Sequence, residues 1–220
     1  MWIVALIAAL VLSYLLGSIN WAIIISKTMT HKDVRESGSG NAGMTNVLRT
    51  AGKTAGILTL IGDIAKGLAA VAIGRYLLFP YIYTLTANEW LAPVYGVFYC
   101  GIACMLGHIF PVFFGFRGGK AVATTVGITL IIDWRITLCA VLVFLILFLF
   151  TKIVSISSIF AAASVTLFAF LYYPLWGYTP EGSRLVLTLL AAVLSLIIIV
   201  KHRSNVVRLI HGEEKKIISK

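Results

Sequence analysis

Long apolar segments limit the fold of this chain more than any other feature of its sequence. Of its 220 residues, 60% are hydrophobic and only 12% are charged, whereas a soluble domain carries about 25% charged residues. This leaves too little polar surface to cover a globule in water. A helix that spans a bilayer needs roughly 20 mostly apolar residues, and several segments reach or approach that length. The sequence therefore predicts an all-α integral membrane protein with a single domain, residues 1–220.

Seven segments are candidate transmembrane helices. The first is too long for the hydrophobic region of a cleaved signal peptide and lacks a preceding basic stretch, so we expect it to remain as a span. Two are short, because Asp133, Trp134 and Arg135 interrupt the apolar stretch 121–151, which could form one long helix or two short ones. The candidates are Trp2–Ile25, Thr54–Phe79, Leu91–Phe114, Ala121–Ile132, Ile136–Thr151, Ile156–Tyr173 and Leu185–Val200.

The polar segments 27–53, 117–120 and 201–220 decide between these alternatives. If they form one site, they must lie on the same side of the membrane. Two spans separate the first from the second, and an even number must separate the second from the third. The stretch 121–151 must then divide into two helices. This predicts a seven-helix transmembrane bundle with the N-terminus outside and the C-terminus in the cytoplasm.

The distribution of charge agrees with that topology. Fourteen of the 18 Lys and Arg residues would lie inside, three (Arg75, Arg135 and Arg184) outside, and Lys66 within a span. Lys and Arg collect on the cytoplasmic side of membrane proteins, so the membrane accounts for much of the net charge of +10. No nucleic-acid partner is expected. An anionic substrate is the rival explanation, and it requires evidence from motifs.

The first segment whose residues suit a binding site is GSGNAGMTNVLR, residues 38–49. Its glycines let backbone N–H groups approach an anion, and its hydroxyl and amide side chains add donors. Arg49 would supply a bidentate charge for phosphate. The alternative is a flexible polar turn. The nearby Gly52–Thr54 is not the end of a nucleotide-binding P-loop, because Val47 stands where that motif needs a glycine.

The second segment runs from Gly107 to Lys120. Gly118, Gly119 and Lys120 precede a predicted helix, whose N-terminus would offer free N–H groups and a positive dipole to an anion. His108 lies near the end of the preceding span, where a lone histidine is more often a structural hydrogen-bonding group.

Two further pairs of polar residues have helical spacing. His202 and Asn205 follow the last predicted span and would share a helix face, although a basic membrane anchor is the alternative there. Asp63 and Lys66 lie within the second span. Ionisable groups at membrane depth are usually paired or functional, so an ion pair that fixes helix packing and a substrate contact both remain open.

The three cysteines lie in apolar stretches. Cys100 and Cys104 share a helix face, but no third or fourth metal ligand accompanies them, and Cys139 is distant in sequence. We interpret them as packing residues. No metal and no cofactor is expected.

Together these segments resemble one family. GSGNAGMTNVLR, GHIFPVFFGFRGGKAVAT and HRSNVVRL, in that order, are similar to the three signature motifs of the bacterial membrane acyltransferases of the PlsY type, and DIAKG at 63–67 is similar too. That family transfers an acyl group from acyl phosphate to glycerol 3-phosphate. The resemblance covers essentially the whole chain. It implies seven spans, an active site on the cytoplasmic face of the bacterial inner membrane, and lysophosphatidic acid as product. It also implies a functional link to the soluble enzyme that makes acyl phosphate.

The motifs and the resemblance together give the candidate site residues. The candidate catalytic residues are Ser39, Lys120, His202 and Asn205. The candidate substrate-binding residues are these four together with Gly40, Asn41, Thr45, Asn46, Arg49, Asp63, Lys66, His108, Gly118 and Gly119. The sequence departs from the family pattern at Ala42, usually Pro, at Met44, usually Ala, and at Ala121, usually Gly. We expect Ala42 to loosen the first loop and Ala121 to be tolerated at the start of the next helix.

The implied chemistry needs little from the protein beyond binding and orientation. Acyl phosphate is a mixed anhydride and already activated, so no covalent acyl-enzyme is required. Positioning alone can lower a barrier by ~7–11 kcal/mol. The pairing of a His with an Asp five positions later, which many acyltransferases use as a base, is absent. The candidate bases are His202 and a substrate phosphate, whose second pKa lies near 6; the resemblance favours the phosphate.

Two rival functions fit parts of the sequence. A transporter of a phosphate-bearing solute would explain the cations, but such proteins usually show internal repeats and polar groups near the bilayer midplane. A phospholipid transferase with cytidine diphosphate-linked donors would need an Asp-rich metal motif, whereas Asp33, Asp63 and Asp133 are isolated.

Overall fold

The computed structural model describes residues 1–175 and 184–217, and within these ranges every element is helical. The chain divides into two compact units, Met1–Ile132 and Asp133–Lys220, which are described separately below. An all-helical chain is what the apolar segments require, because a spanning segment must satisfy its backbone hydrogen bonds internally. The prediction of one domain over residues 1–220 stays a prediction.

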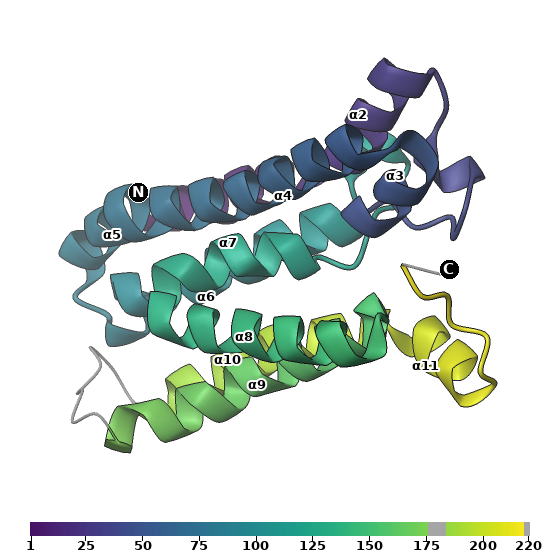
Figure 1. Ribbon diagram of the computed structural model, residues 1–220. Coiled ribbons are helices and arrows are strands. Elements are labelled where there is room, and N and C mark those ends of the chain that lie inside the picture. The colour runs from purple at the N-terminus through teal and green to yellow at the C-terminus, as the bar shows by residue number, and fades with distance from the viewer. Residues whose placement is uncertain (176–183, 218–220) are drawn as a thin grey trace. The chain divides into compact units, whose positions relative to one another are not determined.

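The first unit contains seven α-helices and four short turns of helix (Figure 1). The α-helices are α1 (Trp2–Ser18), α2 (Trp21–Thr30), α3 (Met44–Ala51), α4 (Lys53–Ile73), α5 (Phe79–Thr86), α6 (Pro93–Ile109) and α7 (Val122–Ile132). The short turns are η1 (Val34–Glu36), η2 (Gly74–Leu78), η3 (Glu89–Leu91) and η4 (Val112–Phe114). The second unit contains α8 (Trp134–Thr151), α9 (Val154–Leu175), α10 (Arg184–Lys201) and α11 (Arg203–Ile210).

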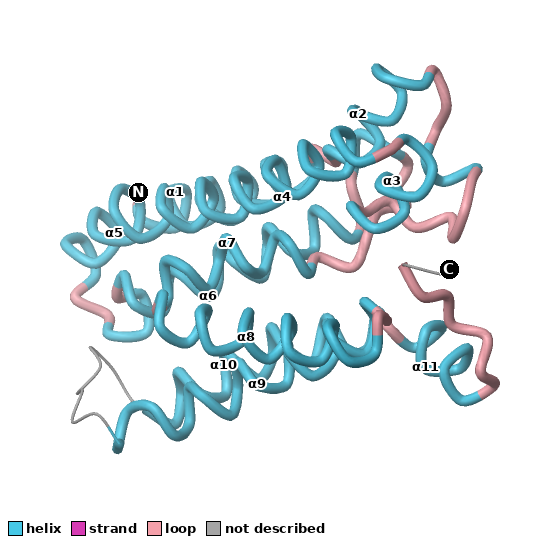
Figure 2. Tube along the Cα trace, in the orientation of Figure 1, coloured by secondary structure: helices cyan, strands magenta, loops and turns pink. Residues whose placement is uncertain are grey.

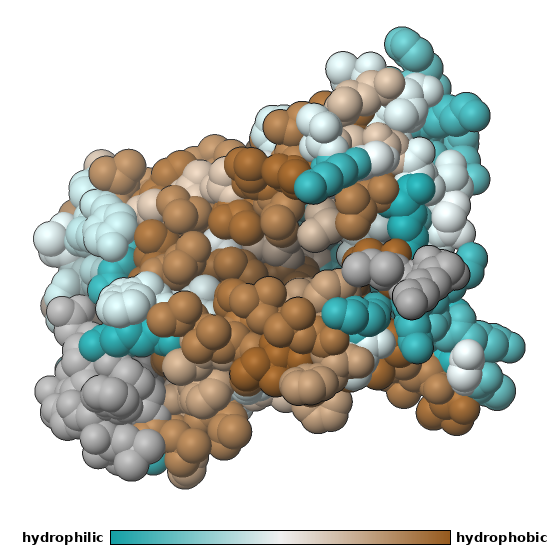
Figure 3. Space-filling view, in the orientation of Figure 1, coloured by the Kyte–Doolittle hydropathy of each residue, from teal (hydrophilic) through white to brown (hydrophobic). Residues whose placement is uncertain are grey.

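Six helical stretches in the described residues are long and apolar enough to cross a bilayer. They are Trp2–Thr30, Lys53–Thr86, Pro93–Phe114, Trp134–Thr151, Val154–Leu171 and Arg184–Lys201. In the space-filling view, apolar side chains in brown cover the lengths of the helices, and polar side chains in teal gather at their ends (Figure 3). The multi-pass prediction is therefore confirmed. The count of seven spans depends on α7, which is apolar but shorter.

The predicted division of the stretch 121–151 is present in the structure. α7 ends at Ile132, and Asp133 caps α8 by accepting a hydrogen bond from the backbone N–H of Arg135 at 2.9 Å. The Arg135 side chain also donates to Asp133, from Nε to Oδ1 and from Nη2 to Oδ2, both at 3.0 Å. Such a cap satisfies the first N–H groups of the new helix, so these two residues mark a helix start.

The prediction that the first span is one continuous helix, by contrast, is wrong. We expected one helix over Trp2–Ile25, but α1 ends at Ser18, Ile19 is extended, and α2 begins at Trp21. The side chain of the fully buried Asn20 accepts a hydrogen bond from the N–H of Ile23 at 3.2 Å. An asparagine that caps a helix in this way competes with a continuous backbone ladder, and hydropathy alone does not reveal it.

Glycines let the helices of the first unit approach closely. A β-carbon on Gly67 of α4 would collide with the carbonyl oxygen of Thr124 in α7, and one on Gly127 of α7 would collide with the carbonyl oxygen of Ile64 in α4. Small residues at contacts of this kind are typical of packed membrane helices. The close α4–α7 contact fixes the position of the segment that leads into α7.

Candidate active site

The first glycine-rich loop is organised by one buried side chain, that of Asn46 in α3. Its Oδ1 accepts a hydrogen bond from the N–H of Ser39 at 2.9 Å, and its Nδ2 donates to the carbonyl oxygens of Val34 at 2.9 Å and Ser37 at 3.0 Å. Gly38 has a φ of +62°, and a β-carbon there would collide with Asn46 Oδ1. The loop therefore wraps around the Asn46 amide. This geometry shows that Asn46 holds the loop, while its predicted contact with substrate stays a prediction.

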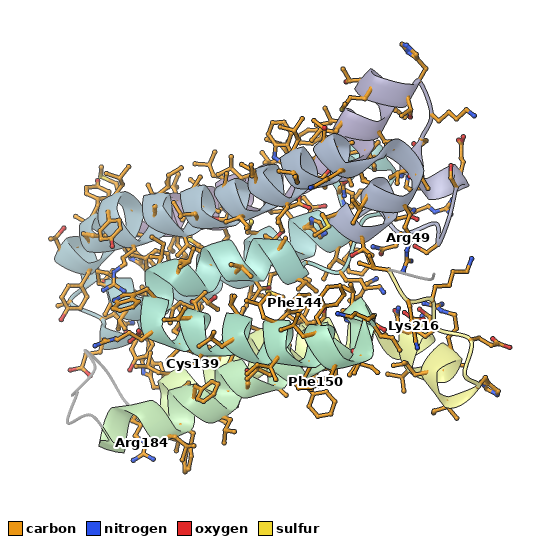
Figure 4. All side chains as sticks on the ribbon, in the orientation of Figure 1. Arg49, Cys139, Phe144, Phe150, Arg184 and Lys216 are labelled. Carbon is orange, nitrogen blue, oxygen red and sulfur yellow. The ribbon has the colours of Figure 1, made fainter. Side chains whose placement is uncertain are left out.

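The same arrangement leaves potential ligands on the outside of the loop. Ser39 and Gly40 are exposed, and Gly40 has a φ of +69°, a conformation that favours glycine. Arg49 lies on α3 at this end of the first unit and is also exposed (Figure 4). Asn41 and Thr45 are half-buried. The exposed hydroxyl and guanidinium groups of this segment can therefore be reached by a phosphate.

The second glycine-rich loop folds back onto the end of α6. The N–H of Gly118 donates to the carbonyl oxygen of Ile109 at 3.1 Å, and the N–H of Gly119 donates to that of His108 at 3.2 Å. A β-carbon on Gly118 would collide with the His108 carbonyl, and one on Gly119 would collide with His108 Nε2 and the Ala42 carbonyl. The glycines thus allow close packing. The prediction that their N–H groups are free at a helix N-terminus is wrong.

The helix after this loop begins close to its predicted start at Ala121. α7 starts at Val122, and its first backbone hydrogen bond runs from the N–H of Thr125 to the carbonyl oxygen of Ala121. Lys120, half-buried, precedes this turn. Ala121 is left-handed with a φ of +61°, which explains why the family usually has glycine at this position. The strain of a non-glycine residue there is of order 1–3 kcal/mol.

Three predicted substrate-binding residues form a buried cluster beneath the loops. Lys66 Nζ lies 2.9 Å from Asp63 Oδ1 and 2.9 Å from His108 Nδ1, and it donates to the carbonyl oxygen of Ile19 at 2.8 Å. His108 Nδ1 lies 3.6 Å from Asp63 Oδ1. Asp63, Lys66 and His108 are 1%, 4% and 3% exposed. These contacts favour the interpretation of an ion pair that fixes helix packing.

The third motif lies in the second unit, where it is tied to the C-terminal segment. His202 is 3% exposed, and its Nδ1 lies 2.9 Å from the carbonyl oxygen of Ile198. A carbonyl oxygen can only accept, so Nδ1 carries a proton. Asn205 Nδ2 donates to Glu214 Oε1 at 2.6 Å. We predicted that His202 and Asn205 share a face of one helix. In the structure His202 precedes α11 as its N-cap, and only Asn205 lies within the helix.

Glu214 lies in the third polar segment, and the sequence predicts no role for it. Its Oε1 accepts hydrogen bonds from Asn205 and from Ser155 Oγ at 2.8 Å, and its Oε2 accepts one from Arg208 Nε at 2.7 Å. Burial opposes ionisation, but these three donors hold the pKa of Glu214 below its ordinary value. The Ile217 N–H also donates to the Lys152 carbonyl oxygen at 3.1 Å. The tail is thus part of the second unit's packing.

The structure brings together the first and second motifs within the first unit. The loops between α2 and α3 and between α6 and α7 lie at the same end of that unit (Figure 2), and Arg35, which was counted only as a basic residue, contacts both. His202 and Asn205 belong to the second unit. The predicted site residues that are exposed or half-buried are Ser39, Gly40, Asn41, Thr45, Arg49, Gly118 and Lys120. The buried ones are Asn46, Asp63, Lys66, His108, Gly119, His202 and Asn205.

Comparison with known proteins places these motifs in a family context. A family model described as glycerol-3-phosphate acyltransferase matches residues 7–212. The glycerol-3-phosphate acyltransferase of Chromobacterium violaceum is 38% identical over 213 residues, which cover 94% of this chain and 93% of the relative. Glycerol-3-phosphate acyltransferase 2 of Bacillus anthracis is 39% identical, over 96% of this chain and 99% of the relative.

Two solved structures are also similar. Both are crystal structures of PlsY, an integral membrane glycerol 3-phosphate acyltransferase. The glycerol 3-phosphate form has a TM-score of 0.78 and 36% identity, and the lysophosphatidic acid form has a TM-score of 0.75 and 35% identity. Each match covers 96% of this chain and 94% of the other.

Proposed function

Because this chain belongs to the glycerol-3-phosphate acyltransferase family, we propose that it transfers an acyl group from acyl phosphate to glycerol 3-phosphate. The products are 1-acyl-glycerol 3-phosphate, which is lysophosphatidic acid, and phosphate. The reaction is the first committed step of bacterial phospholipid synthesis. The observation that carries this proposal is the pair of glycine-rich loops, with an exposed hydroxyl and an exposed guanidinium, at one end of the first unit.

The transfer is a direct displacement. The glycerol hydroxyl oxygen bonds to the acyl carbon, the bond from that carbon to the phosphate oxygen breaks, and the hydroxyl proton moves to a phosphate oxygen. Charge grows on the departing phosphate, and fixed cations and N–H donors stabilise such charge best. Ser39 and Arg49 are proposed to bind substrate phosphate, with Thr45 nearby. Lys120 and the first turn of α7 are proposed to hold the acyl phosphate.

A substrate phosphate is proposed to accept the hydroxyl proton. His202 is the other candidate, but it is 3% exposed and its Nδ1 is directed at a backbone carbonyl. That contact fixes the orientation of the imidazole ring. We propose that His202 and Asn205 are both required for activity, with Glu214 holding Asn205. No cofactor takes part in this scheme.

The donor is tested with purified protein and three acyl donors of equal chain length. We expect lysophosphatidic acid, identified by mass spectrometry, from acyl phosphate and glycerol 3-phosphate, and none from the acyl thioester or acyl carrier protein. Product from the thioesters alone would contradict the proposed donor. Uptake of glycerol 3-phosphate into proteoliposomes without any product would support the rival transporter function.

We also propose seven spans, with the N-terminus outside and the loops in the cytoplasm of a bacterial cell, so that the active site faces soluble glycerol 3-phosphate. α7 is the span that we add to the six long ones, and it lies fourth in chain order. It has 11 residues and is only about 17 Å long at 1.5 Å per residue. The hydrocarbon core is about 30 Å thick. Non-helical backbone at membrane depth is tolerated where protein satisfies it, and the bonds of Gly118 and Gly119 to α6 carbonyls do so.

Cysteine labelling tests the orientation. Glu89 lies between α5 and α6, and Lys216 lies in the C-terminal segment; both are exposed. We expect a membrane-impermeant maleimide to label Glu89→Cys in spheroplasts and to label Lys216→Cys only after lysis. The proposed topology puts the α5–α6 connection outside the cell and the C-terminal segment in the cytoplasm. The unaltered chain, whose Cys100 and Cys104 are buried, provides the background. Labelling of Lys216→Cys in intact spheroplasts would overturn the proposed orientation.

A further inference from the structure

Arg35 joins the two glycine-rich loops. It lies in η1, at the start of the first loop, and its Nη1 donates to the carbonyl oxygens of Phe114 at 2.6 Å and Arg117 at 3.2 Å. Both carbonyls lie in the connection between α6 and α7: Phe114 ends η4, and Arg117 directly precedes Gly118. A single guanidinium thus contacts two residues that lie 79 and 82 positions further along the sequence.

Asp33 fixes the orientation of that guanidinium. Its Oδ1 accepts from Arg35 Nε at 3.0 Å, and its Oδ2 accepts from Arg35 Nη2 at 2.8 Å, which is a bidentate pair. Oδ1 also accepts from the Arg35 backbone N–H at 3.0 Å, and Oδ2 lies 3.2 Å from Lys27 Nζ. The Arg35 hydrogen bonds, opposed by burial, hold the pKa of Asp33 well below its ordinary value. The pair therefore stays ionised at neutral pH.

These contacts leave Arg35 little capacity to bind a ligand. A guanidinium has five N–H donors, and four of them are used: two on Asp33 and two on the second loop. The arginine side chain is 21% exposed. Arg35 therefore differs in role from Arg49, which is exposed on α3. Lysine could not replace Arg35, because an ammonium group cannot reproduce the planar fork.

We infer that Arg35, held by Asp33, is a positioning residue that keeps the second glycine-rich loop in register with the first. This inference rests on the proposed function, in which each loop binds a phosphate-bearing substrate. Each loop retains its own ligands without Arg35, so each substrate still binds. The reacting atoms, however, lose their alignment, and a misplacement of about 1 Å can cost on the order of 100-fold in rate. Loss of Arg35 should therefore lower kcat and change KM much less.

The test compares Arg35→Lys, Arg35→Gln and Asp33→Asn with the wild-type protein and with Glu36→Gln, an exposed charge on the same turn. All are purified in detergent and matched for folded fraction by size-exclusion chromatography and circular dichroism. We expect kcat to fall about 10- to 100-fold in both Arg35 variants, and less in Asp33→Asn, while both KM values stay within about 3-fold of wild type. Glu36→Gln should keep wild-type kcat.

A second readout does not depend on catalysis. Trypsin cleaves after Arg117, an exposed residue of the second loop, and a released loop should be cleaved faster. We expect faster cleavage at Arg117 in Arg35→Gln than in wild type or Glu36→Gln. Wild-type kcat and wild-type cleavage in Arg35→Gln would overturn the inference, and so would a raised KM for glycerol 3-phosphate with unchanged kcat. Absence of product with the wild-type protein would instead count against the proposed function, while the cleavage rates would still test the link between the loops.

Discussion

Removing the guanidinium of Arg49 should abolish most of the activity while leaving the fold intact. Loss of a charge-assisted contact to a phosphate costs about 2–5 kcal/mol, which is roughly a 30-fold or greater loss in kcat/KM for glycerol 3-phosphate. We therefore expect Arg49→Ala to fall at least that far. Ser39→Ala, which removes an exposed hydroxyl of the same loop, should show a smaller loss in the same direction. Steady-state kinetics with acyl phosphate at saturation measures both.

The matched control for these variants is Lys32→Ala. Lys32 is an exposed cation that lies just before the first loop, so it reports the general effect of removing positive charge from this end of the first unit. Its kcat/KM should stay within about 3-fold of wild type. The thermal unfolding temperature of each variant, followed by circular dichroism, separates a loss of binding from a loss of folding. Equal losses in Arg49→Ala and Lys32→Ala would mean that the loop acts only through its overall field.

Removing the charge of Lys66 should destabilise the fold much more than it changes substrate affinity. Lys66→Met leaves Asp63 buried without its closest cationic partner, and breaking a buried pair in this way costs about 3–5 kcal/mol. The double variant Asp63→Asn/Lys66→Met should recover most of that loss, since no uncompensated charge remains. Unfolding in detergent, followed by circular dichroism, measures both. This cycle separates the two interpretations that the sequence left open.

The opposite pattern would favour a substrate contact. In that case Lys66→Met would unfold like wild type but show a raised KM, and the double variant would not recover activity. The structure favours the packing interpretation because all three charged or polar groups contact one another and the carbonyl oxygen of Ile19. That carbonyl lies at the break between α1 and α2, so Lys66 also satisfies a backbone group that no helix uses.

The features that could be predicted from the sequence are those with a local signal. Apolar length identified the spanning helices, and the requirement that the polar segments share one side of the membrane predicted the division at 133–135, where the structure has Asp133 as the cap of α8. Asn20 gave no comparable warning, since one amide within an apolar stretch hardly changes its hydropathy. Its capping role depends on the backbone that surrounds it.

The details of the site were harder to predict because they depend on backbone carbonyls, which every residue carries. Nothing in the sequence indicates that Arg35 donates to the carbonyls of Phe114 and Arg117, or that Gly118 and Gly119 donate to the end of α6. Asn46 of the first motif is predicted to bind substrate because the chemistry of its amide suits a ligand. In the structure its amide fills the turn that holds Ser39, a contact that the sequence does not reveal. Motif residues can therefore shape a site without lining it.

Equilibrium binding of glycerol 3-phosphate, without an acyl donor, tests most directly whether the first loop is a phosphate site. Calorimetry on the purified wild-type protein should give saturable binding with one site per chain. Arg49→Ala should weaken that binding by about 30-fold or more, while Lys32→Ala should bind like wild type. Unchanged affinity in Arg49→Ala, with its activity lost, would contradict the account, because the phosphate of glycerol 3-phosphate would then be bound elsewhere.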